Sequence, residues 1–311
     1  MIEGSKTGKT NPIVTYGMVG GGEGAFIGDV HRHAIAFDGK ARLVAGSFSR
    51  SMSKTLSTGE ELHIDKDRLY ETYAEMAAAE AARDDGIDFV AVVTPNASHY
   101  AISKAFLEKG INVVCDKPLT TDSGQAEELA ELAKKNNLLF AVTYTYSGYP
   151  TVKHARAMIA AGEIGDIRFV NAEYPQEWLA EKLEDSGQKQ ASWRSDPAQS
   201  GISNCVGDIG SHIENTVSYM TGLKIKRLSA RLDTFVENRI LDDNATIMLD
   251  YEGGAKGVYW SSQIAVGHDN GLAVRVYGSK GSIRWRQEDP NYLEVAFLDK
   301  PAMKISRGRD T

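Results

Sequence analysis

The chain has 311 residues, of which 42% are hydrophobic and 25% charged, a composition typical of a globular protein. This length predicts two domains. The net charge is -7 and there is no long basic run, which argues against nucleic acid or an anionic membrane as the main partner. No apolar run approaches membrane-spanning length, and the polar N-terminus lacks the apolar core of a secretory signal.

The two cysteines, Cys115 and Cys205, form neither a C-x-x-C pair nor a zinc-binding spacing. We therefore expect two reduced thiols and a cytoplasmic protein. His31 and His33 lie two apart on a predicted helix and point in different directions, so the sequence predicts no metal site there.

The N-terminal segment Gly4–Thr10 resembles a phosphate-binding loop, because it ends in Gly8-Lys9-Thr10. That motif requires a glycine five residues before the Gly-Lys pair, and Glu3 occupies the position. No strand precedes the segment either, so we interpret it as a flexible tail.

The first half of the chain alternates strand and helix patterns, beginning with an apolar strand at Ile13–Tyr16 and a helix at Ile27–Phe37. Further strands are predicted at Arg42–Phe48, Asp88–Val93, Asn112–Cys115 and Leu138–Thr143, and further helices at Asp67–Ala82, Ser98–Lys109 and from a cap at Asp122 to Asn136. Repeated units of this length predict a doubly wound parallel sheet.

The second half opens with a helix at Val152–Ala161 and a strand at Ile167–Glu173, followed by a polar stretch at Glu177–Ser200 and a short helix at Asp208–Met220. Strands are then predicted at Arg227–Val236, Asn244–Tyr251, Ala255–Ser262, Leu272–Tyr277 and Ser282–Trp285. The predicted fold class is α/β, with residues 1–146 as the parallel domain and residues 147–311 as a second α/β domain containing an open, mostly antiparallel sheet.

A glycine-rich turn joins the first strand to the first helix. Gly20 and Gly22 match the first two positions of a Gly-x-Gly-x-x-Gly/Ala motif, and Ala25 matches the third. Glycines let the backbone approach a pyrophosphate, while the free N–H groups at the helix start, near Phe26 and Ile27, face its negative charge. The turn therefore predicts a dinucleotide site.

The residues that distinguish NAD from NADP are expected at the end of the second strand. NAD-binding proteins usually place an acidic residue there to bind the ribose 2′-hydroxyl, whereas an arginine suits a 2′-phosphate. This chain has Ser49 and Arg50 and no acid. Arg50 either holds a 2′-phosphate or is an exposed side chain that tolerates both cofactors, so both NAD and NADP stay open.

Two later strand ends carry polar residues at the edge where open α/β sheets bind ligands. After the strand at Asp88–Val93 come Thr94, Pro95, Asn96 and His99, which we expect to contact the cofactor. The alternative for His99 is a capping or surface histidine.

The next strand end carries Asp116-Lys117-Pro118. The Lys117 ammonium can stabilise an alkoxide beside the nicotinamide, or it is a solvated side chain after a strand. Pro118 restricts Lys117 and permits a cis peptide bond between them.

Asp208 and His212 are four residues apart, so on a helix they share a face. Histidine suits removal of a hydroxyl proton near neutral pH, and the aspartate can orient the substrate or the histidine. The alternative is a capping aspartate and a structural histidine. Arg194 either contacts a substrate hydroxyl or pairs with Asp196.

Taken together, these motifs resemble the Gfo/Idh/MocA oxidoreductases in order and spacing over nearly the whole chain. The motifs are Gly17–Gly22, Thr94-Pro95-Asn96 with His99, Asp116-Lys117-Pro118 and Gly207–His212. The glycine turn with His31-Arg32 is most similar to the branch that contains levoglucosan dehydrogenase.

The resemblance implies a Rossmann domain, followed by a domain whose open sheet covers the active site and often mediates homo-oligomers. It implies NAD(P)-linked oxidation of a ring hydroxyl on a sugar or polyol. Lys117, with Asp116 in place of the family's glutamate, matches the E-K-P lysine, and Asp208 and His212 match the D-x-x-x-H pair. In the family the histidine is usually read as proton acceptor, with the lysine supporting it electrostatically.

Two departures from the family pattern stand out. The acidic residue that binds the ribose is absent. Relatives usually continue with a helical segment beyond the strand-rich region, so we expect that the chain, which ends at Thr311, is truncated.

Two other functions are compatible with the same fold. One is a glycoside-cleaving enzyme that keeps NAD bound and oxidises its substrate transiently. The other is a non-catalytic sensor that binds dinucleotide, against which the presence of Lys117, Asp208 and His212 argues. Fold alone does not decide between these chemistries.

Overall fold

The computed structural model describes residues 13–308, which form two compact units, one ending at Thr143 and the other starting at Tyr144. The predicted N-terminal tail, with its phosphate-loop-like segment Gly4–Thr10, lies outside the described residues. Among the residues that are described, no helix is both long and apolar enough to cross a membrane.

The N-terminal unit contains a five-stranded parallel sheet with the strand order β2-β1-β3-β4-β5. Its strands are β1 (Val14–Gly20), β2 (Ala41–Ser47), β3 (Phe89–Val93), β4 (Asn112–Cys115) and β5 (Phe140–Val142). Its helices are α1 (Phe26–Ala36), α2 (Met52–Glu61), α3 (Tyr73–Ala81), α4 (His99–Glu108) and α5 (Ser123–Lys135). The predicted doubly wound parallel sheet is confirmed.

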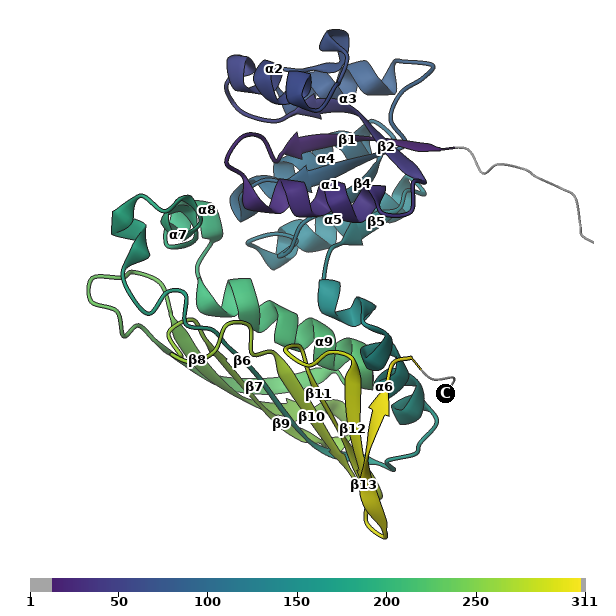
Figure 1. Ribbon diagram of the computed structural model, residues 1–311, viewed down its shortest axis with the longest axis vertical. Coiled ribbons are helices and arrows are strands. Elements are labelled where there is room, and N and C mark those ends of the chain that lie inside the picture. The colour runs from purple at the N-terminus through teal and green to yellow at the C-terminus, as the bar shows by residue number, and fades with distance from the viewer. Residues whose placement is uncertain (1–12, 309–311) are drawn as a thin grey trace, which may run out of the picture. The chain divides into compact units, whose positions relative to one another are not determined.

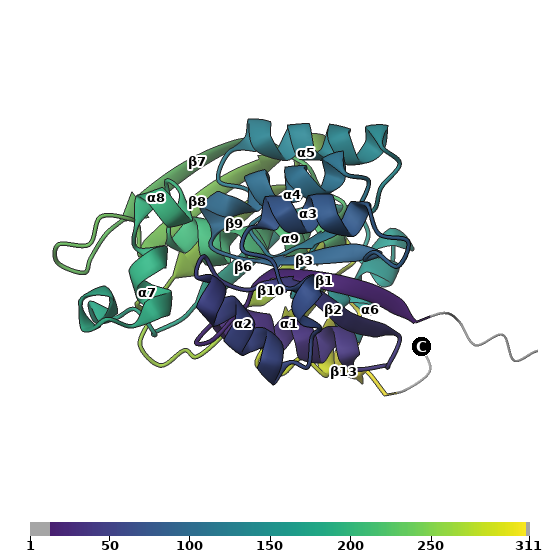
Figure 2. The ribbon, with the colours of Figure 1, turned by 90° about the horizontal axis from the view of Figure 1, so that it is seen from above.

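Apolar residues cover both faces of this sheet. Along β3, Val90 and Val92 pack with α3, α4 and α5, whereas Ala91 and Val93 pack on the other face, where Ile27 and Ile35 of α1 lie. Figure 2 shows α3–α5 on one side of β1 and β3, and α1 and α2 on the other. Burial on both faces explains why β3 is a continuous apolar run in the sequence.

Two predictions for this unit are wrong. Helix α2 was not predicted, because its buried positions are Thr55, Thr58 and Gly59 rather than large apolar residues. The single helix predicted at Asp67–Ala82 is interrupted: Tyr70 N–H donates to Gly46 O (2.9 Å), which keeps that segment extended beside β2. Helix α3 starts only after Thr72, which forms a capping box with Glu75.

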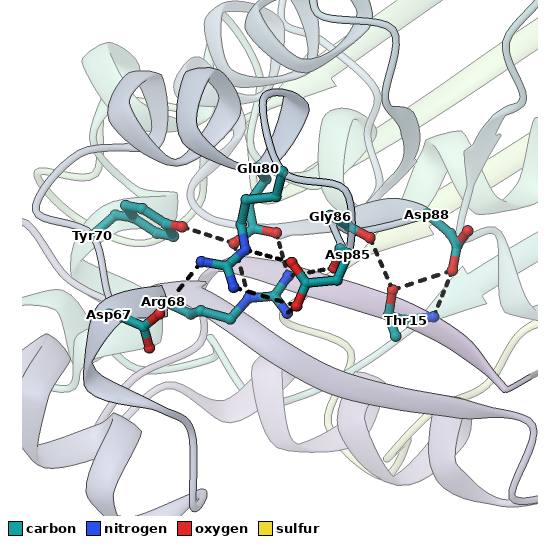
Figure 3. Close-up of polar contacts among 9 residues, drawn as sticks. Thr15, Asp67, Arg68, Tyr70, Glu80, Asp85, Gly86 and Asp88 are labelled. Atoms are coloured by element: carbon teal, nitrogen blue, oxygen red, sulfur yellow. Dashed lines mark hydrogen bonds and ion pairs between the residues drawn. The ribbon is translucent and has the colours of Figure 1, made fainter.

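A buried ion pair ties Arg68, in the short 3-10 turn just before this extended segment, to α3 (Figure 3). The Arg68 guanidinium pairs with the fully buried Glu80 carboxylate, which also accepts from the Tyr70 hydroxyl at 2.8 Å. Arg68 also donates to Asp85 O (3.3 Å). Each charge in this network has a partner, as burial of a charge requires.

The C-terminal unit contains an eight-stranded sheet with the order β13-β12-β11-β10-β6-β9-β8-β7. Its strands are β6 (Ile167–Pro175), β7 (Ile225–Asp233), β8 (Asn244–Tyr251), β9 (Lys256–Ser262), β10 (Ala273–Gly278), β11 (Gly281–Arg286), β12 (Tyr292–Phe297) and β13 (Lys300–Ser306). Every neighbouring pair is antiparallel except β6–β9. The predicted open, mostly antiparallel sheet is confirmed.

Two long helices, α6 (Pro150–Ala160) and α9 (Ser211–Thr221), lie along one face of this sheet (Figure 1). Their apolar faces form a core with the strands, in which Val152, Met158, Ile213 and Val217 are buried.

Strands β12 and β13 were not predicted. The polar stretch Glu177–Ser200 contains two short helices, α7 (Lys189–Arg194) and α8 (Pro197–Ser200), so Arg194 ends a helix rather than lying in a loop.

The helix predicted at Asp208–Met220 begins earlier, and its first turn is a π-helix rather than an α-helix. Residues Val206–Gly210 form one turn of π-helix, which leads directly into α9. The buried Asp242 carboxylate secures the start of this turn: it accepts from Asn204 N–H (2.9 Å), Val206 N–H (3.0 Å) and the Ser203 hydroxyl (3.1 Å). A carboxylate at a helix start satisfies N–H groups that have no helical partner.

We predict that Glu80→Ala lowers the free energy of unfolding by about 3–5 kcal/mol, because it removes the buried carboxylate partner of Arg68 and leaves only the exposed Asp85 carboxylate, 3.6 Å away, to pair with it. Urea denaturation measures the change. Asp67→Asn is the matched control, since Asp67 is exposed and pairs at the surface with Arg83. This variant should lower the free energy of unfolding far less. Equal losses in the two variants would contradict a stabilising role for the buried pair.

Candidate functional site

The glycine turn after β1 has no room for side chains. Gly20 has φ +83°, and a Cβ there would lie 2.8 Å from Thr94 Cγ2 and 2.9 Å from Val93 O. A Cβ on Gly22 would lie 2.9 Å from Phe48 O. The turn is therefore pressed against the ends of β3 and β2, which is the setting in which a backbone can approach a pyrophosphate.

The closest packing of α1 against the glycine turn lies beyond Ala25, the residue that matches the third motif position. Ala25 is the residue before α1 and makes no side-chain cap, with its N–H donating to Gly22 O (3.0 Å). The close helix-to-turn approach occurs instead at Gly28, where a Cβ would lie 2.4 Å from Gly21 Cα. The third glycine of a dinucleotide motif permits this packing. The sequence signal for Gly28 is a glycine one turn into the helix.

Two side chains of α1, Ile27 and Arg32, hold the start of this helix and the glycine turn before it in place. The Ile27 side chain packs into the core, whereas Phe26 is 68% exposed. Arg32, which the sequence analysis did not assign, donates from Nη1 to Gly21 O (2.8 Å) and so braces the glycine turn. The free N–H groups at the start of α1 are the candidate phosphate ligands.

At the end of β2, Ser49 belongs to a compact turn leading into α2. Its N–H donates to Thr55 Oγ1 (3.1 Å), and its hydroxyl accepts from Ser51 N–H (3.2 Å). Arg50 is exposed and forms no ion pair with any residue between 13 and 308. This turn carries no carboxylate, in keeping with the sequence.

The ends of β3 and β4 are held side by side by the sheet register. Val92 lies opposite Cys115, and Asp116 N–H donates to Val92 O (2.9 Å). The Ser98 hydroxyl lies 2.7 Å from both Thr94 Oγ1 and Pro95 O. These two contacts hold together the turn that contains the buried Asn96. The predicted strand-end positions are thus brought to one edge of the sheet.

His99 lies inside the fold, between the turns that follow β3 and β4. Its side chain is fully buried, and its Nδ1 and Nε2 lie 2.8 Å from Pro118 O and Thr94 O, respectively. Both ring nitrogens are therefore used within the fold, and the surface-histidine alternative is wrong. Burial lowers the pKa of His99, and the two carbonyl contacts oppose that shift.

Asp116 is likewise engaged by the protein itself. Its carboxylate accepts from the Thr143 hydroxyl (3.0 Å) and lies 3.6 Å from Nε2 of the buried His31 on α1. Burial alone would raise the pKa of Asp116, but the His31 hydrogen bond and the charges of His31 and Lys117 outweigh it and lower the pKa. Asp116 is thus an ionised group directly before Lys117. The Lys117–Pro118 peptide bond is cis.

In the C-terminal unit, Asp208 lies in the π turn and receives two contacts on the same oxygen. Gln263, fully buried after β9, donates from Nε2 to Asp208 Oδ2 (3.0 Å). Arg194 Nε lies 3.3 Å from Oδ2. The predicted alternative pairing of Arg194 with Asp196 is wrong, because Asp196 instead caps α8 through Ala198 N–H (2.9 Å).

Aromatic side chains fix Arg194 in place. The guanidinium lies 4.3 Å from the Trp193 ring centroid and 5.8 Å from that of Trp178, and Nη1 donates to Gln190 Oε1 at 2.6 Å. Arg194 is therefore both stacked and hydrogen-bonded beside Asp208. Neither Gln263 nor the tryptophan pair was identified from the sequence, since their relation to Asp208 depends on the folded sheet.

His212 lies on the first turn of α9 within a cluster of tyrosines. Its ring centroid is 4.8 Å from that of Tyr146, 5.5 Å from Tyr144 and 6.0 Å from Tyr174. The Tyr146 and Tyr174 hydroxyls are 2.6 Å apart, and the Tyr174 hydroxyl donates to Asn270 Oδ1. Burial raises the pKa of both tyrosines, so their hydroxyls stay protonated at neutral pH.

Within residues 13–308, no three His, Cys, Asp or Glu side chains gather in an arrangement that could hold a metal ion. Among the residues predicted to be functional, the C-terminal unit holds a histidine with tyrosines and an aspartate with an arginine, and the N-terminal unit holds Asp116 followed by Lys117. These groups suit proton transfer and charge stabilisation.

Comparison with known proteins identifies the class of both units. Residues 14–144 match the model of an oxidoreductase family with an NAD-binding Rossmann fold, and residues 152–284 match the GFO/IDH/MocA C-terminal domain. The chain therefore belongs to the Gfo/Idh/MocA family of oxidoreductases. The resemblance inferred from the sequence motifs is confirmed.

Several relatives and solved structures are similar over most of the chain. The chain is 39% identical over 299 residues to the uncharacterized oxidoreductase YfiI of Bacillus subtilis (strain 168), covering 94% of this chain and 75% of that protein. It is 27% identical over 242 residues to levoglucosan dehydrogenase of Pseudarthrobacter phenanthrenivorans, covering 70% of this chain and 60% of that protein.

Two crystal structures of an inositol dehydrogenase homolog from Azotobacter vinelandii are also similar. The one complexed with NAD+ has a TM-score of 0.93 at 40% identity, covering 99% of this chain and 79% of that chain. The one complexed with NADH and myo-inositol has a TM-score of 0.89 at 38% identity, covering 96% and 76%. The expected nicotinamide dinucleotide cofactor is thus confirmed for the N-terminal unit.

We predict that Gly28→Ala weakens NADH binding and lowers the melting temperature, because the added methyl group forces α1 away from Gly21. Overpacking of this kind typically costs about 1–3 kcal/mol. Titration of NADH fluorescence and thermal denaturation measure the two effects. Gly148→Ala is the control, since a Cβ there meets nothing within 4 Å; a Gly28→Ala protein that binds NADH like the control would refute the assignment.

Proposed function

We propose that this protein is an NAD(P)-dependent dehydrogenase that oxidises a secondary hydroxyl of a cyclitol or sugar. His212 is the proton acceptor, Asp208 orients the substrate, and Lys117 supports the developing alkoxide. Arg194 is proposed to contact a substrate hydroxyl from its place beside Asp208. Gly20, Gly22 and the first turn of α1 hold the pyrophosphate.

The observation that carries this proposal is the environment of His212. The imidazole is surrounded by the apolar rings of Tyr144, Tyr146 and Tyr174, and burial keeps the hydroxyls of Tyr146 and Tyr174 protonated. Such a mixture suits a polyhydroxylated ring, which has apolar C–H faces and a rim of hydroxyls. A buried imidazole in this setting can accept the proton of a substrate hydroxyl.

Lys117 contributes charge rather than a proton in this proposal. A cation beside the hydroxyl oxygen favours the alkoxide that forms as the proton leaves. The ionised Asp116, held by Thr143 and His31, precedes Lys117 in the turn and is a nearby counter-charge for its ammonium group. The bound nicotinamide supplies the hydride acceptor.

The substrate class is supported by the relatives. An inositol dehydrogenase homolog was crystallised with myo-inositol and NADH, and levoglucosan dehydrogenase acts on an anhydrosugar by its name. We therefore favour a cyclitol as the first substrate to test, followed by anhydrosugars and monosaccharides.

A spectrophotometric screen tests this function. The purified protein is mixed with NAD+ or NADP+ and each polyol, and the absorbance of the reduced nicotinamide is followed. Net formation of NADH or NADPH with at least one cyclitol or sugar is expected. Cleavage of a glycoside without net reduction would favour a glycoside-cleaving enzyme instead, and cofactor binding without any turnover would favour a sensor.

We predict that Lys117→Ala and His212→Ala each lower kcat by about 10²–10⁴-fold, the range typical of lost acid–base catalysis. NADH affinity should stay near that of the wild type, because neither side chain is proposed to hold the pyrophosphate. Steady-state kinetics and fluorescence titration separate these effects. Wild-type turnover in both variants would remove the catalytic assignment.

We also predict that the protein accepts both cofactors, with Arg50 favouring the 2′-phosphate of NADP. Arg50→Ala should then weaken NADP binding about tenfold or more, as expected for loss of a charge-assisted contact, and change NAD binding much less. Calorimetric titration of both cofactors measures the ratio. An equal effect on NAD and NADP would leave Arg50 without a role in cofactor choice.

A further inference from the structure

His99 is placed between the two turns that carry proposed site residues. It is the first residue of α4, its side chain is fully buried, and its two ring nitrogens face two different strand-end turns. Nδ1 lies 2.8 Å from Pro118 O, in the turn after β4, and Nε2 lies 2.8 Å from Thr94 O, in the turn after β3. One side chain therefore spans both turns.

Both partners of the ring are carbonyl oxygens, which only accept hydrogen bonds. A neutral imidazole carries one N–H group and can donate to one of them, whereas an imidazolium donates to both. The position of the ring proton therefore decides which turn is held. The turn that contains Pro118 also contains Lys117, the proposed catalytic side chain.

The turn that presents Lys117 has separate supports before and after the lysine. Before it, Asp116 is fixed through its N–H on Val92 O (2.9 Å) and its carboxylate on Thr143 (3.0 Å). After it, the contact from His99 to Pro118 O fixes the next carbonyl. Anchors on both sides restrict the backbone path of Lys117 and thereby the origin of its side chain.

We propose that His99 is a positioning residue, whose Nδ1–H donates to Pro118 O and holds the turn that presents Lys117. The proposal rests on the proposed dehydrogenase function, because it gives His99 its effect through Lys117. Displacing a catalytic group by about 1 Å costs on the order of 10²-fold in rate. His99 thus acts on turnover without itself touching substrate.

The first test locates the ring proton in the wild-type protein and needs no substrate. With ¹⁵N-labelled histidine, two-bond ¹H–¹⁵N spectra distinguish a protonated Nδ1 from a protonated Nε2, and the signals absent from His99→Asn belong to His99. A proton on Nδ1, alone or together with one on Nε2, is the expected result. A proton on Nε2 alone would overturn the proposal.

The second test uses two amide variants that each keep one donor. In matching rotamers the amide nitrogen of asparagine lies near the place of Nδ1, and that of glutamine near the place of Nε2. His99→Asn therefore keeps a donor for Pro118 O, and His99→Gln keeps one for Thr94 O. Both variants lose the ring, so their comparison cancels the cost of the lost packing.

The two amide variants should differ in their turnover rates. We expect kcat to be about tenfold or more lower in His99→Gln than in His99→Asn, since only the first loses the anchor beside Lys117. NADH affinity, measured by fluorescence, should differ less between them than kcat does. Equal kcat values, or a lower value in His99→Asn, would overturn the proposal. His63→Asn, at an exposed histidine after α2, is the control for histidine loss.

The two tests separate failure of this proposal from failure of the proposed function. If the wild type turns over no polyol, the dehydrogenase function fails, and the ring-proton measurement still decides the role of His99. If either amide variant does not fold by circular dichroism, that same measurement again decides. If the wild type turns over a polyol and the ring proton lies on Nε2 alone, the dehydrogenase function stands and the proposed role of His99 fails.

Discussion

The parallel register of β1, β3 and β4 is the constraint on which the dinucleotide-binding edge of the N-terminal unit depends. Gly20 lies opposite Val93, and Val92 lies opposite Cys115. Because parallel strands end at the same edge, the glycine turn, the Thr94 turn and the Asp116-Lys117 turn all lie there. A Cβ on Gly20 would already collide with Thr94, which shows how closely the turns approach. Arg32 and His99 then bind the turns to their helices.

The C-terminal unit positions its acid and its histidine by a different device. The parallel pair β6–β9 brings two strand ends together, so that Gln176 N–H donates to Ser262 O (2.7 Å) and Gln263 follows directly. Gln263 then fixes Asp208 in a π turn whose start is capped by Asp242. A π turn re-aims side chains relative to an α-helix and is often found at functional sites. Asp208 and His212 thus owe their setting to strand ends and a capping carboxylate rather than to helix spacing alone.

The sequence was informative wherever function imposes a local pattern. The glycine turn, the buried run of β3 and the Asp122 cap, which accepts from Gln125 N–H at 3.1 Å, follow from nearest neighbours. It failed where the cause lies in the packing of elements against one another. Gly28 acquires its role from its approach to Gly21. Likewise, the ring of His99 lies between carbonyl groups of the turns after β3 and β4, and no local pattern in the sequence indicates those two contacts.

Transfer of deuterium is the measurement that tests the account most directly. The protein is incubated with NAD+ and myo-inositol deuterated at its ring carbons, and the reduced cofactor is analysed by mass spectrometry. The account predicts NADH that carries one deuterium from the substrate carbon, because hydride passes directly between the two. Reduced cofactor without that deuterium would contradict direct hydride transfer, and the absence of reduced cofactor with any deuterated cyclitol or sugar would contradict the dehydrogenase function itself.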